Sequence, residues 1–128
     1  MKTKLFTFAI IAFLCISCKG QTVESIQVIP ARDFAEKIKS DPNAQILDVR
    51  TPEEYKGQHL TNAVNVDWNG EDFAAKAAKF DKSKPVYVYC RSGGRSKKAS
   101  EKLHEMGFTE IYDMQGGITK WNAEGLED

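Results

Sequence analysis

The sequence is poor in cysteine and histidine, and it carries no excess charge of either sign. Its 128 residues include three cysteines and two histidines, and 18 basic residues balance 18 acidic ones. No basic stripe or run of like charge is present, so the composition gives no indication of a nucleic-acid partner. His59 and His104 are far apart in the chain and do not form a metal-binding constellation with a cysteine. We therefore expect no metal, no other cofactor and no nucleic acid.

The apolar run near the start is also too short to span a bilayer. It extends from Leu5 to Leu14, whereas a spanning helix needs about 20 apolar residues. Lys2 and Lys4 precede this run, and a small residue, Ser17, follows it. This order is typical of a secretory signal peptide, so we expect residues 1–17 to be removed.

The end of this segment resembles the lipobox of bacterial lipoproteins, although Cys15 stands where a lipobox usually has leucine. Cleavage there leaves Cys18 as a lipid-bearing N-terminus. We expect residues 18–24 to be a polar tether and the chain to lie on the periplasmic side of a bacterial membrane. The alternative is an ordinary signal peptide cut nearby, which leaves an unanchored periplasmic protein. The sequence does not distinguish the inner from the outer membrane.

The remaining chain suits one compact domain, expected over residues 25–128 and expected to be a monomer. Without Lys2 and Lys4 its charge is −2, from 16 basic and 18 acidic residues. Cys15 leaves with the signal peptide and Cys18 is blocked by lipid, so Cys90 is the one free thiol and no internal disulfide can form. A lone cysteine is either an inert buried residue or a reactive one.

The surroundings of Cys90 favour a reactive thiol. An apolar run, Val86 to Tyr89, leads into Cys90, and a helical pattern follows the loop. The intervening residues are small, flexible or basic: Arg91, Ser92, Gly93, Gly94, Arg95 and Ser96. Backbone N–H groups in such a loop, the positive end of the next helix and the Arg95 guanidinium would point inward and favour thiolate over thiol. We expect Ser96 to serve also as the N-cap of that helix.

Strand-like and helix-like stretches alternate along the rest of the domain, which predicts an α/β fold with a parallel sheet. The expected strands are 26–29, 45–49, 63–66, 86–89 and 109–114, and the expected helices are 31–40, 51–56, 71–79, 96–106 and 118–123. Ligands of such sheets bind at the carboxyl ends of the strands, which is where Cys90 lies. A capping box at Thr51 to Glu54 and a helix stop at Gly107 support these boundaries.

Three stretches of the chain resemble the rhodanese family. They are Leu47 to Tyr55 with Gly57 to Ala63, the loop from Cys90 to Ser96, and Gln115 to Trp121. The resemblance implies a three-layer fold with a central five-stranded parallel sheet, and sulfur transfer through a persulfide on Cys90 cradled by residues 91–96. Thr61 and Asn62 depart from the proline and glycine that the family often has there, which affects the expected shape of that loop.

The expected reaction moves a sulfane sulfur from a donor such as thiosulfate to cyanide or a thiol. Asp48 and Arg50, at the end of the second strand, are expected to support the site by tying loops together. For Arg91, substrate recognition and a purely solvated side chain remain open alternatives. Both tryptophans, Trp68 and Trp121, are interpreted as packing residues.

Two alternative functions follow from the same loop. A cysteine phosphatase also places a cysteine before an arginine at a helix start, but with five intervening residues rather than the four found here. A tethered persulfide carrier or sensor would use the same loop to pass sulfur to a partner protein. The sequence identifies neither the donor nor the acceptor.

Overall fold

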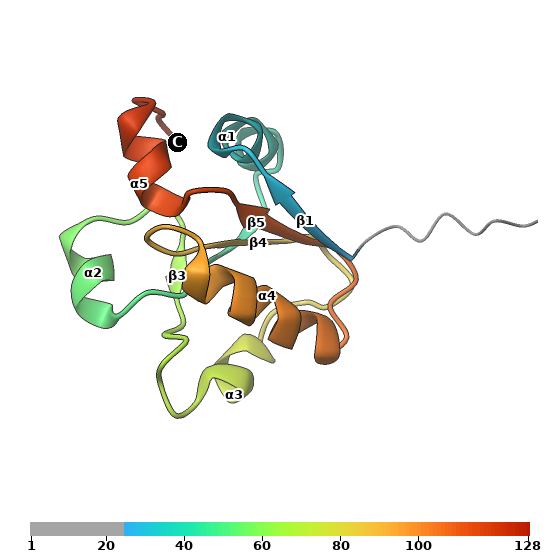
Figure 1. Cartoon of the computed structure of the whole chain (residues 1–128). Coiled ribbons are helices and arrows are strands. Elements are labelled where there is room, and N and C mark those ends of the chain that lie inside the picture. Colours follow the sequence, from blue (N-terminus) through green and yellow to red (C-terminus); the bar gives the residue numbers. More distant parts are fainter. Residues whose placement is uncertain (1–24) are drawn as a thin grey trace, which may run out of the picture.

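The computed structural model describes residues 25–128 (Figure 1). The expected signal peptide, Cys18 and the tether lie outside the described residues. Strands and helices alternate: β1 (Ile26–Ile29), α1 (Ala31–Ser40), β2 (Gln45–Asp48), α2 (Pro52–Gly57), β3 (Val64–Asn65), α3 (Phe73–Ala77), β4 (Val86–Tyr89), α4 (Gly94–Glu105), β5 (Ile111–Met114) and α5 (Gly117–Ala123). Among residues 25–128, no helix combines the length and apolar character needed to cross a bilayer.

The strands form one five-stranded parallel sheet in the order β1-β5-β4-β2-β3, which confirms the predicted fold class. All four residues of β4 are buried, because this strand lies at the centre of the sheet with helices on both faces. Since all strands run in the same direction, their carboxyl ends meet at one edge. The loops that follow β2, β4 and β5 therefore converge there.

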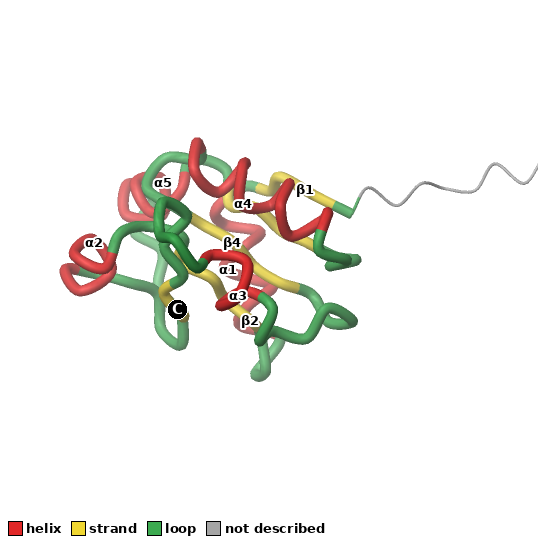
Figure 2. The backbone as a smooth tube through the Cα atoms, turned by 90° about the horizontal axis from the view of Figure 1, so that it is seen from below, coloured by secondary structure: helices red, strands yellow, loops and turns green. Residues whose placement is uncertain are grey.

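Helices cover both faces of the sheet (Figure 1), and each face has its own apolar core. On one face, α1 and α5 bury Phe34 and Trp121 against Tyr87 and Tyr112 of the sheet. On the other face, α3 and α4 lie across the strands, as the view from below in Figure 2 shows. The short helix α2 lies to one side, near the carboxyl edge of the sheet.

The predicted helix boundaries hold where local hydrogen bonds define them. Thr51 and Glu54 form the expected capping box at the start of α2. After α4, Gly107 takes a left-handed φ of +102°, which is the expected helix stop. The start of α4 differs: the helix begins at Gly94 and its N-cap is Gly93, so the expectation that Ser96 caps it is wrong. The left-handed φ of Gly93, +115°, turns the chain into the helix before Ser96 is reached.

The loop between α2 and β3 keeps a tight turn despite its departure from the family pattern. The N–H of Ala63 donates to the carbonyl of Leu60 at 3.1 Å, and Asn62 has a φ of +64°. Asparagine tolerates this left-handed conformation better than other non-glycine residues. Asn62 therefore takes the backbone conformation that glycine would otherwise supply.

Candidate functional site

Cys90 follows β4 directly and lies at the carboxyl edge of the sheet. It is a free cysteine with 1% of its surface exposed. Its side chain nevertheless borders an open pocket of about 290 Å³, which is lined by Trp68, Asn69, Cys90, Ser92, Gly94, Arg95 and Lys98. The sulfur therefore lies at the base of a pocket large enough for a small molecule.

The loop after Cys90 curls around the sulfur. The N–H of Gly93 donates to Cys90 Sγ at 3.0 Å. The thiol in turn donates to Ser96 Oγ at 3.4 Å, and the Ser96 hydroxyl donates to the Gly93 carbonyl at 3.2 Å. Because α4 starts at Gly94, its first amides also lie at this end of the loop. This arrangement suits a sulfur anion, which gains from backbone donors and from the positive end of a helix.

The start of α5 fixes the orientation of the loop. The N–H of Ile118 donates to the Cys90 carbonyl at 2.9 Å, and that of Thr119 donates to the Arg91 carbonyl at 3.1 Å. These contacts hold the two carbonyls on the side of α5, away from the pocket. Gly117 permits this approach, since a Cβ on it would lie 2.5 Å from the backbone of Cys90 and Arg91. The second glycine of the Gln115 to Trp121 stretch thus has a direct role in shaping the cysteine loop.

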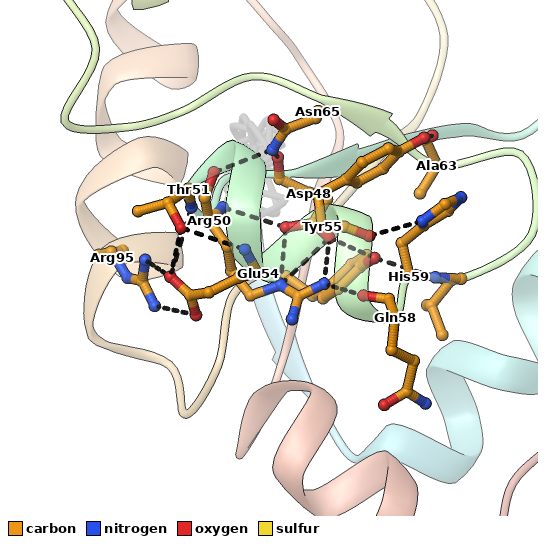
Figure 3. A network of polar contacts seen from close by, with 12 residues as sticks. Asp48, Arg50, Thr51, Glu54, Tyr55, Gln58, His59, Ala63, Asn65 and Arg95 are labelled. Carbon is orange, nitrogen blue, oxygen red and sulfur yellow. Dashed lines mark hydrogen bonds and ion pairs between the residues drawn. The ribbon is translucent and has the colours of Figure 1, made fainter.

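Arg95 lines the pocket, but its guanidinium binds Glu54. Nη1 lies 2.6 Å from Glu54 Oε1 and Nη2 lies 3.0 Å from Oε2. Figure 3 draws both contacts as dashed lines. The structure therefore differs from the expectation that Arg95 presents its guanidinium to the sulfur. Its charge acts on Cys90 through space, and its hydrogen bonds close the rim of the pocket onto α2.

Glu54 is a site residue that the sequence analysis did not single out. Its carboxylate caps α2 through Thr51 and also accepts both hydrogen bonds from Arg95. These bonds from Arg95 lower the pKa of Glu54 to about 2, and the bonds from Thr51 act in the same direction. A carboxylate with a lowered pKa stabilises the folded state above its ordinary pKa, here 4.5, and that contribution is lost progressively as the pH falls from there through about 2. The pair therefore persists throughout the neutral range.

Asp48 and Arg50 form a second, deeper ion pair, whose hydrogen bonds reach the loop after α2. Arg50 Nη2 lies 2.6 Å from Asp48 Oδ2 and also 2.6 Å from the Gln58 carbonyl (Figure 3). The Tyr89 hydroxyl donates to Asp48 Oδ2 at 2.7 Å and accepts from the Leu60 N–H. Desolvation is the largest single effect and opposes the charge on Arg50, but hydrogen bonding and charge attraction from Asp48, with smaller effects of Tyr89, together outweigh it and raise the pKa of Arg50. The network joins β2, β4 and the loop after α2, immediately before Cys90.

The other expected residues lie at different depths. Arg91 is exposed and does not line the pocket, whereas Lys98 does. Trp68 packs on Phe73 with ring centroids 5.0 Å apart, as a packing residue would, but it also forms one wall of the pocket. No group of three or more histidine, cysteine, aspartate or glutamate side chains in residues 25–128 is arranged to hold a metal ion.

Fold and site together define a class of protein: a parallel α/β domain that holds a buried cysteine, followed by a glycine-containing loop, at the carboxyl edge of its sheet. The family model for the Rhodanese-like domain matches residues 31–124. The chain belongs to this family, as the resemblance in its sequence indicated.

Known proteins extend this relationship. The protein YqhL of Bacillus subtilis (strain 168) is 37% identical over 81 residues, which cover 63% of this chain and 63% of YqhL. Thiosulfate sulfurtransferase 16, chloroplastic, of Arabidopsis thaliana is 39% identical over 90 residues, covering 62% of this chain and 75% of that protein. The crystal structure of a rhodanese-related protein from Thermoplasma volcanium superposes with a TM-score of 0.68 at 33% identity, covering 77% of this chain and 93% of that one. The chain thus spans less than two thirds of the length of YqhL.

The close approach at Gly117 leads to a prediction with a matched control. Gly117 and Gly125 both have left-handed φ values, +58° and +63°, but a Cβ on Gly125 would meet nothing within 4 Å. Gly125→Ala should cost about 1–2 kcal/mol of unfolding free energy from backbone strain alone. Gly117→Ala should cost about 3 kcal/mol or more, because overpacking against the loop backbone is added. Urea denaturation of both variants measures the difference, and equal losses would contradict the account of the loop.

Proposed function

We propose that this domain is a sulfurtransferase that carries sulfane sulfur as a persulfide on Cys90. The observation that supports this most directly is the position of the sulfur: Cys90 Sγ accepts a hydrogen bond from the Gly93 N–H at the base of an open pocket. Membership of the rhodanese-like family and the likeness to a thiosulfate sulfurtransferase support the same reaction class.

In the first half of the proposed reaction, the Cys90 thiolate attacks the outer sulfur of a donor such as thiosulfate. The new S–S bond forms as the bond to the sulfite group breaks, and sulfite leaves with the electron pair. The product is a persulfide whose outer sulfur carries the negative charge. The backbone donors at the start of α4, together with Lys98 beside them, suit that charge in the pocket.

In the second half, a thiophilic acceptor such as cyanide or a thiol attacks the outer sulfur of the persulfide. The S–S bond breaks, the sulfur leaves with the acceptor, and its electron pair returns to Cys90 as a thiolate. Neither half requires a redox cofactor, because each is a displacement at sulfur. The residues that hold the sulfur anion in the free enzyme therefore also receive it as the leaving group.

Intact mass after exposure to thiosulfate tests the proposal directly. We expect the purified domain to gain one sulfur atom and to lose it on addition of cyanide. Cys90→Ser should show no gain, because the hydroxyl cannot form the persulfide. Repeated conversion of thiosulfate and cyanide to thiocyanate would indicate a free enzyme, whereas loading that stalls after one equivalent would indicate a carrier for a partner protein. Failure to load at all, or turnover of an aryl phosphate that depends on Cys90, would contradict sulfur transfer.

The ion pair at the pocket rim gives a second prediction, on substrate charge. Glu54→Gln preserves the capping contact to Thr51, since glutamine also serves at this position, but it removes the negative charge beside Arg95. We expect the KM for thiosulfate to fall about twofold to fivefold, the range of a partly exposed ion pair, and the difference to shrink at high salt. Glu53→Gln is the control. The Glu53 carboxylate is next to Glu54 in the sequence but forms no ion pair in the described part of the chain. An unchanged or higher KM in Glu54→Gln would contradict this account of the pocket.

We also propose that the chain is exported and held on the periplasmic side of a bacterial membrane by lipid on Cys18. Support for this comes from the order of residues 1–18 alone: basic residues, an apolar run, then a small residue before the cysteine. Fractionation of cells that produce the full chain should find it with membranes. Cys18→Ser should remove it from the membrane fraction, and a distribution that the substitution leaves unchanged would exclude the anchor.

A further inference from the structure

A polar cluster lies behind the cysteine loop, between α4 and β5. Two buried side-chain oxygens in residues 25–128 have no hydrogen-bond partner: Ser100 Oγ on α4 and Asp113 Oδ1 on β5. Ser100 is fully buried and Asp113 is 3% exposed. Buried polar groups are nearly always hydrogen-bonded, so two unpartnered atoms on facing elements require an explanation.

Asp113 occupies a position that an apolar residue would be expected to fill. It pairs in register with Val28 of β1 and with Val88 of β4, two residues before Cys90. Side chains alternate along a strand, so Asp113 lies on the same face as Ile111, which packs beneath α4. The carboxyl group thus lies under the helix whose first turn adjoins the sulfur.

Ser96 lies beside the sulfur, on the helix that covers Asp113. Its hydroxyl lies 3.4 Å from Cys90 Sγ. Ser96 is fully buried on the side of α4 that faces β5, one helical turn before Ser100. Burial raises the pKa of Asp113 to about 6, and hydrogen bonding by the same Ser96 hydroxyl acts in the opposite direction. The Ser96 hydroxyl, which contacts the sulfur and donates its hydrogen to the Gly93 carbonyl, thus belongs to the same buried polar cluster as Asp113.

We propose that Asp113 is a positioning residue for Cys90 that acts through the Ser96 hydroxyl. A protonated Asp113 donates its hydrogen to Ser96 Oγ, and the Ser96 hydrogen then turns from the Gly93 carbonyl, to which it donates in this structure, to the Cys90 sulfur anion. An ionised Asp113 accepts the Ser96 hydrogen, and the sulfur anion retains the Gly93 N–H without the Ser96 hydroxyl. The orientation of one hydroxyl thus links the protonation of Asp113 to the reactivity of Cys90.

The remaining groups around Asp113 offer few other partners. The pocket that borders Asp113 on its outer side is lined from α4 by two charged side chains, Lys97 and Glu101. β1 contributes Ile26 and Val28 to it, which carry no charge, and the segment after β5 contributes Gln115. Within β4, the register neighbour of Asp113 is the apolar Val88. The buried polar side chains on α4, the helix that covers Asp113, are Ser96 and Ser100.

Alkylation of Cys90 by iodoacetamide between pH 5 and pH 9 tests the inference. It rests on the proposed role of Cys90 as the nucleophile, but alkylation needs no sulfur donor, so its outcome is separate from that of the persulfide experiment. Asp113→Asn is neutral at every pH, and its amide can donate to Ser96 Oγ. We expect its alkylation near pH 7 to be about threefold to tenfold faster than that of the unchanged protein, the range for one hydrogen bond to the sulfur anion.

A double-mutant cycle separates action through Ser96 from direct repulsion between the two charges. In a Ser96→Ala background, Asp113→Asn should no longer change the alkylation rate, and Ser96→Thr, which keeps a hydroxyl, should restore the effect. Ser100→Ala is the matched control, because it removes the other unpartnered oxygen of the cluster from the same helix and should leave alkylation unchanged. The inference is overturned if Asp113→Asn has no effect in the unchanged background, or if its effect is equally large without the Ser96 hydroxyl. Circular dichroism on each variant establishes that it is folded at the pH of the measurement.

Discussion

The site depends on which way the peptide groups of the cysteine loop face. Two amides at the start of α5 hold the carbonyls of Cys90 and Arg91. The N–H of Gly93 faces the opposite side and donates to the sulfur. A loop with the same side chains but rotated peptide planes would present carbonyl oxygens to the sulfur and repel an anion. Gly117 makes the orientation possible because only a residue without Cβ allows α5 to start this close to the loop.

Two ion pairs of different depth surround this loop and serve different purposes. Asp48 and Arg50 are buried, and their hydrogen bonds reach the loop after α2 and the strand that ends in Cys90. Glu54 and Arg95 are partly exposed at the pocket rim. Breaking a buried pair is costly because it leaves one charge uncompensated. The inner pair of Asp48 and Arg50 therefore stays formed and mainly fixes the positions of β2, β4 and the loop after α2. The outer pair costs little to open, so it can set how much positive charge an incoming anion meets.

The sequence predicted the fold and placed Cys90 at the end of a strand because both depend on local patterns. Alternating apolar runs located the strands, and Cys90 follows one of them. The partner of Arg95 was not predicted, although Glu54 was recognised in a capping box, because its second contact joins residues 41 positions apart. Trp68 was interpreted as packing alone, since only the folded chain brings it beside the pocket. The Ser96 cap was wrong because a left-handed glycine begins the helix earlier than the side-chain pattern indicates. Asp113 lay unnoticed within a short, otherwise apolar strand.

Asp113, the buried acid beneath α4, is relevant to the balance between the thiolate and the proposed persulfide of Cys90. An unpartnered carboxyl oxygen in a core destabilises a fold, and such a group is more readily explained where it acts on a reacting atom. In the thiolate, the negative charge is on the Cys90 sulfur, within reach of Ser96. In the proposed persulfide, the charge moves to the outer sulfur, about 2 Å further from the Cys90 side chain and toward the open pocket. If Asp113 acts through Ser96 as proposed, its ionisation withdraws a donor that the thiolate needs more than the persulfide does. The same group would then favour the sulfur-loaded form at neutral pH and the empty form in acid.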